Sequence, residues 1–437
     1  MTYSGSSKSP PDSGSASVNS WGAFGYRDFR YFWASGFFQG IARTMRDTLT
    51  FLIVFQLSGS ALALGITGVF QAIPAILFGL LGGAMADAMD RKKLLIYTQM
   101  ANVVAGSLLA FLVLFDFIEV WHIWLFASFW TGVHILGRPA QRAYMPRLVP
   151  ANYLMNAITW FGALSQGTQI FGALAAGFIA AFVGVGWAFV VNAAVLAIAL
   201  LTILPIRASG RPEGDNQGVS FRTVWEGVQF VRMKEVLVSS FVLDFGVMSV
   251  GFIRPILTIL ALEVFMVGEM GLGVMNAATA AGSVLGTFIL LKIGNVDRKG
   301  AVILAAYGLY SVGLLGLGAA SWVPGDTQGL QLFGISLWFL AALVALTVMG
   351  SMDVVAFTLK QSMIQLVAPD QFRGRASSLS SILSVLGNAT GAVENGAIAA
   401  VFGAPGAIVI NSFIALGVTG AVGARWRGLW RYRDVEG

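Results

Sequence analysis

Ionisable side chains inside long apolar stretches are the residues of this sequence best placed to do chemistry. A charged side chain in hydrocarbon costs roughly 3 kcal/mol or more, so it normally faces a polar cavity and has a partner or a function there. Bases of this kind can hold an anionic group, and a carboxylate or an imidazole can exchange protons. These residues predict a substrate or proton pathway through a membrane: Arg43, Arg46, Asp47, His134, Asp244, Arg254, Asp353 and Glu394.

The spacing of the first three of these residues predicts a cluster. Arg43 and Asp47 are four residues apart, so they share one face of a helix and can form an ion pair, and Arg46 lies near the same face. One interpretation is a neutralised structural pair. The other is a role in substrate or proton binding, which we favour because intramembrane charges are a functional hypothesis by default.

The carboxylates are the candidates for proton coupling. A carboxyl group in a dry cavity can exchange a proton near neutral pH, which favours Asp353 and Asp244 for this role. The alternative is that each only accepts hydrogen bonds from a neighbouring helix. Glu394 either joins them or supports packing near the end of its helix. His134 ranks below the carboxylates, because a lone intramembrane histidine is as often a hydrogen-bonded packing residue.

The elements that must position these residues are transmembrane helices. The chain is 57% hydrophobic and 11% charged, with a mean hydropathy of +0.77, whereas a soluble domain has about 25% charged residues. At about 20 apolar residues per crossing, the pattern predicts an all-α membrane protein with twelve transmembrane helices. The predicted spans are residues 31–56, 62–86, 94–115, 120–140, 153–182, 186–206, 236–262, 270–292, 301–321, 332–358, 376–402 and 404–424.

The distribution of bases predicts the orientation of these spans. If the N-terminus is cytoplasmic, all of the 27 Lys and Arg residues except Arg43, Arg46 and Arg254 fall on the cytoplasmic side, with Lys360 in one of the loops there. The positive-inside rule therefore predicts that both termini are cytoplasmic, in a plasma membrane or bacterial inner membrane. The sequence pI near 9.6 is then a signal of topology, and no nucleic-acid partner is expected.

The chain also divides into two similar halves. A shift that superposes residues 89–93 (MDRKK) on 296–300 (VDRKG) places the seventh span on the first, and residues 141–150 (QRAYMPRLVP) resemble 360–369 (KQSMIQLVAP). Two pseudo-symmetric six-helix bundles are therefore predicted. The predicted segments are a disordered tail (1–28), the first bundle (29–206), a cytoplasmic linker with an amphipathic helix (207–235), the second bundle (236–424) and a basic tail (425–437).

The loop after the second span carries the motif of a known family. Gly83, Asp87, Lys92 and Lys93, with Arg91 before the last two, resemble the loop motif of the major facilitator superfamily, from which Asp90 and Ala88 depart. Residues 26–33, 137–157 and 369–379 resemble the branch of enterobactin exporters and transmembrane secretion effectors. The resemblance implies parallel six-helix repeats that rock about a central cavity lined by helices one, four, seven and ten, where most of the ionisable residues fall.

The same loop is a candidate gate. The resemblance implies that Asp87 meets the positive N-terminus of the eleventh helix, near Arg373 and Arg375. A contact made in only one state would bias the rocking equilibrium. The alternative is a basic loop that only sets topology, near anionic lipid headgroups. The gating residues on this hypothesis are Gly83, Asp87, Asp90, Arg91, Lys92, Lys93, Arg373 and Arg375.

Two glycines of the fifth span are predicted to support close helix packing. Gly172 and Gly177 lie in SQGTQIFGALAAG (165–177), which resembles a degraded form of the Gly-Pro signature of exporters, with Ala173 where proline is expected. This departure weakens the inference of export. Small residues at a helix surface let a neighbouring backbone approach.

The remaining composition narrows the class of function. The chain has no cysteine and two histidines, so that no metal site is expected, and no nucleophile-base set or cofactor loop predicts an enzyme. We predict a monomeric, proton-coupled exporter of a small amphipathic molecule, drug-like or siderophore-like, in contact with membrane lipids. The alternatives are a lysophospholipid or lipid flippase, and a sensor of the same shape that binds a ligand without moving it.

Overall fold

The computed structural model describes residues 21–78, 89–211, 228–294, 296–322, 331–332 and 335–432. Residues 1–20 of the predicted N-terminal tail, most of the predicted linker helix, Gly83 and Asp87 lie outside these residues. Residues 21–28, predicted as part of the disordered tail, are described, and they are helical from Gly22 to Gly25 and from Arg27 onward. The first half contains six long helices: α1 (Arg27–Ser58), α2 (Ala61–Phe78), α4 (Arg91–Leu114), α5 (Val120–Tyr144), α6 (Leu154–Val183) and α7 (Val185–Ile203). Short helices precede or join them: η1 (Gly22–Gly25), η2 (Met145–Arg147) and η3 (Ala151–Tyr153).

The second half begins with a broken helix. It comprises α9 (Glu235–Gly251), α10 (Arg254–Ile259) and a π-helical turn, η4 (Leu260–Val264). Then follow α11 (Gly268–Ile293), α12 (Lys299–Ser321), α13 (Leu337–Val367), α14 (Asp370–Arg425) and α15 (Arg427–Arg431). Two short strands, β1 (Gln331–Leu332) and β2 (Ile335–Ser336), pair antiparallel between α12 and α13.

Eight of the described helical segments are long and apolar enough to cross a membrane, which confirms an all-helical membrane protein. The largest of them contains a turn. Gly403 has φ 73° and ψ 166°, a backbone conformation open to glycine, and it interrupts the 56-residue α14 just before Pro405. α1 and α5 have membrane-spanning length but are not among the eight; α1 carries three charged residues of the predicted pathway, and α5 carries His134.

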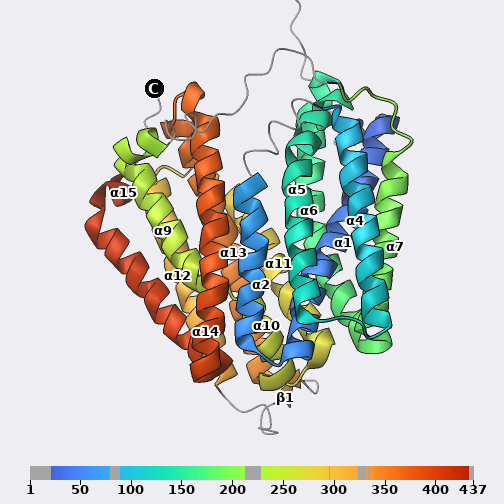
Figure 1. The fold of residues 1–437 in the computed structure, drawn as a ribbon. Coiled ribbons are helices and arrows are strands. Elements are labelled where there is room, and N and C mark those ends of the chain that lie inside the picture. Colours follow the sequence, from blue (N-terminus) through green and yellow to red (C-terminus); the bar gives the residue numbers. More distant parts are fainter. Residues whose placement is uncertain are drawn as a thin grey trace, which may run out of the picture.

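The helices pack in two groups. In the first group, α1 packs on α6 and α7, α4 packs on α5 and α7, and α2 packs on α5. In the second, α12 packs on α13 and α14, α9 on α14, and α11 on α13. Figure 1 shows the two groups beside each other, with α2 in the middle. We call the end of the molecule at which α1, α4, α9 and α12 begin the basic end, because Arg27, Arg91, Lys234 and Arg298 lie there.

The close glycine contacts between the two groups lie toward the end opposite the basic end. The start of α11 packs on the end of α6, where a Cβ on Gly177 would lie 2.7 Å from the Cα of Gly273. The start of α2 packs on α14, where a Cβ on Gly396 would lie 2.7 Å from the carbonyl oxygen of Ala61. Side chains larger than hydrogen would separate these backbones, so the glycines allow the two groups to close at this end.

Candidate functional site

A cavity of about 320 Å³ lies between the two groups of helices. Its walls come from α1, α5 and α6 on one side and from α10, α11 and α13 on the other. Six of the eight predicted pathway residues line it: Arg43, Arg46, Asp47, His134, Arg254 and Asp353. Asp244 and Glu394 are not among its lining residues.

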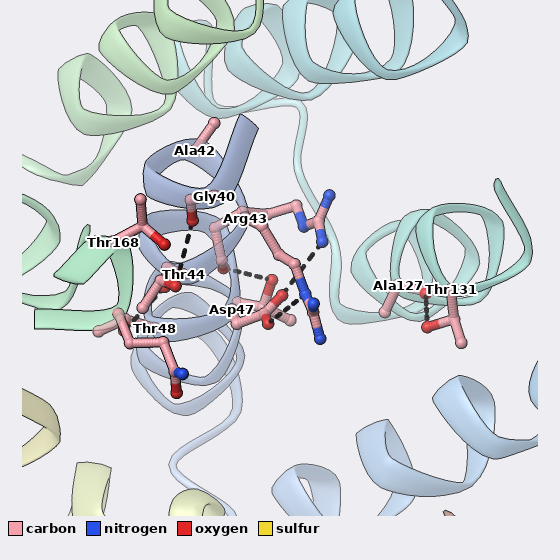
Figure 2. Close-up of polar contacts among 12 residues, drawn as sticks. Gly40, Ala42, Arg43, Thr44, Asp47, Thr48, Ala127, Thr131 and Thr168 are labelled. Carbon is pink, nitrogen blue, oxygen red and sulfur yellow. Dashed lines mark hydrogen bonds and ion pairs between the residues drawn. The ribbon is translucent and has the colours of Figure 1, made fainter. Parts of the chain in front are cut away.

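The charged cluster of α1 forms one wall. Figure 2 shows Arg43 and Asp47 on one face of the helix, as their spacing predicts. Asp47 Oδ1 lies 3.2 Å from Arg46 Nη2, and Asp47 Oδ2 lies 3.8 Å from Arg43 Nε. Arg46 is buried, with its guanidinium carbon 4.7 Å from the centre of the Trp130 ring on α5. The Arg43 side chain is 50% exposed, so it extends into the cavity.

Close packing of α1 on α6 positions this cluster. A Cβ on Gly40 would lie 2.6 Å from Thr168 Oγ1, and a Cβ on Gly172 would lie 2.7 Å from the carbonyl oxygen of Ile41. The two helices therefore touch one turn from Arg43. The predicted packing glycines occupy different contacts, since Gly172 faces α1 and Gly177 faces α11 in the other group.

A break in the helix brings Arg254 to the opposite wall. α9 ends at Gly251 and α10 begins at Arg254, so two residues leave the helix near its middle. Asn395 Nδ2 on α14 donates to the carbonyl oxygens of Val250 at 3.2 Å and Phe252 at 3.3 Å, and Tyr310 Oη on α12 donates to Gly251 O at 2.7 Å. These bonds satisfy carbonyl groups that the interrupted helix leaves without intrahelical partners.

Asp353 on α13 and His134 on α5 also line the cavity. His134 Nε2 is buried and has no hydrogen-bond partner in the part of the chain that the structure describes. The alignment of the two halves that superposes Gln141 on Lys360 also superposes His134 on Asp353. The repeat therefore predicts equivalent places for the two residues in the two groups of helices.

Asp244 belongs to a different, buried polar cluster within the second group. Its Oδ2 lies 2.6 Å from Lys360 Nζ and accepts a hydrogen bond from Ser384 Oγ at 3.0 Å. Its Oδ1 accepts from Tyr307 Oη at 2.5 Å. The expectation that Lys360 lies in a loop is wrong: it is on α13 and its side chain is 0% exposed. Lys360 lies seven residues after Asp353 on the same face of that helix, which is a signal that sequence reasoning missed.

Glu394 lies on α14 and is partly buried. It is next to Asn395, which bonds the break between α9 and α10, and close in sequence to Gly396, which packs on α2. Sequence reasoning singled out the glutamate and missed the asparagine, because an amide has no charge to mark it in an apolar run. Among the described residues, no three His, Cys, Asp or Glu side chains come together as a metal-ion site.

The described residues of the predicted gating loop bind the first group of helices. Asp90 caps α4, since its Oδ1 accepts from the backbone N–H groups of Lys92 at 2.9 Å and Lys93 at 3.2 Å. Lys92 Nζ donates to Ile206 O at 2.6 Å, and the Arg91 backbone N–H donates to Gly210 O at 2.9 Å. Arg91 and Lys92 thus attach the segment after α7 to the start of α4.

The predicted partners of Asp87 lie at the start of α14. Arg373 Nε donates to Gln365 O at 2.9 Å and to Ala368 O at 3.1 Å, at the end of α13. The Arg375 guanidinium lies over the Phe372 ring, 5.4 Å from its centre. Because Gly83 and Asp87 lie outside the described residues, the gate itself stays a prediction.

Comparison with known proteins gives a family and a fold. The family described as transmembrane secretion effectors matches residues 18–427. Macrolide efflux protein A of Streptococcus pyogenes is 24% identical over 65% of this chain and 71% of its own length. An enterobactin exporter of Shigella boydii is 24% identical over 75% of this chain and 74% of its own. A bacterial homologue of the human lysosomal transporter Spinster, solved inward-facing and unoccupied, superposes with a TM-score of 0.70 at 14% identity, covering 94% of this chain and 98% of that one.

Proposed function

We propose an export function from the premise that the chain belongs to the transmembrane secretion effector family of major facilitator transporters. The protein is a secondary transporter, and its cargo on this proposal is a small amphipathic organic molecule that leaves the cell by alternating access. The macrolide efflux protein and the enterobactin exporter are distant relatives, and both names denote outward transport, which supports export as the direction.

One observation carries the proposal: a charged cavity lies between two groups of helices that touch at one end. The contacts of Gly177 with Gly273 and of Gly396 with Ala61 lie beyond the cavity, at the end opposite the basic end. Assigning the basic end to the cytoplasm by the positive-inside rule makes this an inward-facing arrangement. Rocking would then open those contacts and close the basic end.

The proposed topology has twelve spans and two cytoplasmic termini. Each group of helices contributes six spans, with the linker 207–235 between the bundles 29–206 and 236–424. The broken helix counts as one span and α14 as two, on either side of Gly403. The spans are α1, α2, α4, α5, α6, α7, then α9 through η4, α11, α12, α13 and the two legs of α14.

Asp353 is the proposed proton carrier. It lines the cavity, whereas Asp244 already has the ammonium group of Lys360 at 2.6 Å and two hydroxyl donors. A carboxylate that the solvent in the cavity can reach can take up and release a proton during the cycle. Asp244 then serves to join α9, α12, α13 and α14.

Flux through reconstituted vesicles tests the proposal. The full chain in proteoliposomes is given an imposed pH gradient and screened with dyes, siderophores and lysolipids. We expect at least one dye or siderophore to accumulate against its own concentration gradient. In the Asp353→Asn variant, we expect that flux to become independent of the imposed pH gradient. Asp116→Asn is the matched control, because Asp116 is exposed in a loop and asparagine tolerates its φ of 57°.

The other outcomes separate the alternatives. Movement of lysolipids without movement of dyes or siderophores would favour a flippase. Binding of a solute without any flux would favour a sensor and contradict transport. If the flux through the Asp353→Asn variant responds to the pH gradient as the wild type does, Asp353 is not the proton carrier.

A further inference from the structure

We propose that the cargo carries an anionic group, such as a carboxylate, sulfonate or phosphate, which the guanidinium groups of Arg43 and Arg254 bind. The proposal deepens the transport function and rests on it. It follows from the charges that line the cavity, from which of them already have partners, and from where the remaining ones lie.

The cavity lining has an excess of positive charge. Among the described lining residues, the charged side chains are the arginines Arg43, Arg46 and Arg254 and the aspartates Asp47 and Asp353. Arginine stays protonated at any physiological pH, so the three positive charges are permanent. Two carboxylates at most offset two of them, and protonation of Asp353 would leave a larger excess. A cargo with a negative charge would neutralise this excess.

The exposed positive charges lie on opposite walls. Arg46 is buried against Trp130, and its Nη2 is within hydrogen-bond distance of Asp47, so it is already occupied. Arg43 is half exposed and its Nε is 3.8 Å from Asp47, which is longer than a hydrogen bond. Arg254 is exposed on α10 in the other group of helices. An anion between Arg43 and Arg254 would bridge the two halves.

The rest of the lining fits an apolar body on the same molecule. Aromatic and aliphatic side chains line the cavity beside the arginines, among them Phe51, Phe161, Leu164, Leu257 and Leu272. A guanidinium group offers paired donors that match the two oxygens of a carboxylate or the oxygens of a phosphate. The ligand class is therefore an organic anion with a hydrocarbon or aromatic portion.

Matched pyrene probes test the charge preference. Pyrenebutyrate, pyrenebutyramide and pyrenebutylamine share one apolar body and differ in charge. We expect the full chain, purified in detergent, to bind the butyrate about tenfold more tightly than the amide, and the amine more weakly still. Arg43→Gln and Arg254→Gln should each reduce the tenfold preference to about threefold or less. Arg254→Lys should retain most of it, because the charge remains.

Lys292→Gln is the matched control, since it removes an exposed charge at the end of α11, outside the cavity lining. It should leave the preference unchanged. Equal or tighter binding of the amide or the amine, failure of the butyrate to bind, or a tenfold preference that survives both glutamine variants would each overturn the proposal. Thermal melting of each variant checks that it is folded.

Flux of the same probes separates this inference from the proposed function. Transport of the amide or the amine without preference for the butyrate would overturn the anionic cargo and leave the transporter. Anion-selective binding with no flux of any probe would support the anion-binding site and contradict the transport function.

Discussion

Removing the ammonium group of Lys360 should be among the most damaging single changes in this chain. Its Nζ lies 2.6 Å from Asp244 Oδ2, and both side chains are almost completely buried. Lys360→Met preserves the length and the apolar part of the side chain but leaves a buried carboxylate without its counter-charge. Breaking a buried ion pair by removing one partner costs about 3–5 kcal/mol. The hydroxyl groups of Tyr307 and Ser384 still donate to Asp244, but neutral donors offset only part of this loss of stability.

The paired replacement should recover most of that loss. Lys360→Met with Asp244→Leu removes both charges, and replacing a whole buried pair by apolar residues is often neutral or stabilising. Melting of the purified protein in detergent measures the effect: we expect the single variant to lower Tm by about 3–5 °C and the double variant to return most of it. Exposed Lys292→Met is the control and should shift Tm by a degree or less.

Two results would refute the reasoning. If the single variants melt like the wild type, the pair does not contribute to stability. If the losses of the two single variants simply add in the double variant, the two side chains do not interact. The double variant also tests the assignment of Asp244, since gradient-driven flux that survives in it would show that this carboxylate is not the proton carrier.

Three further changes have expected outcomes. Asn395→Leu removes the donor to the carbonyl groups of Val250 and Phe252 at the α9–α10 break, so we expect binding of an anionic probe to weaken about tenfold; unchanged binding would mean that these bonds do not position Arg254. Gly177→Leu should separate α6 from α11 and so increase cross-linking between the two groups of helices at the basic end. An unchanged cross-linking pattern would contradict the close approach of α6 and α11. Asp87→Asn should preserve expression and lower turnover at least tenfold; normal turnover would leave the loop with a topological role only.

Much of the fold was predictable because hydrocarbon constrains composition strongly. The predicted ends of the third, fourth and ninth spans lie within a few residues of α4, α5 and α12, except where α5 extends beyond the predicted end to Tyr144. The break between the predicted eleventh and twelfth spans coincides with Gly403. The interruption at residues 252–253 was not predictable in the same way. Phe252 and Ile253 are apolar, so the hydropathy of the span is continuous there.

The residues that line the cavity could be predicted better than the partners of the buried polar groups could. A charge in an apolar run stands out, which is why six of the eight predicted residues line one cavity. Lys360 escaped notice because a base near the cytoplasmic end of a span looks like a loop residue. Asn395 escaped because an amide carries no charge. Both act through neighbours on other helices, and one sequence contains no direct record of which helices touch.

The repeat shows where sequence periodicity stops being informative. The shift that superposes residues 89–93 on 296–300 places Asp47 on Arg254, and the separate alignment of 141–150 with 360–369 places His134 on Asp353, so each pair is polar but differs in charge or chemical type. The places of these polar residues follow from duplication, because both copies fold into the same kind of helix bundle. The charge at each position does not follow from duplication, because a side chain can be replaced without a change in the helix that carries it. The charge balance of the cavity therefore depends on the residues of both halves together.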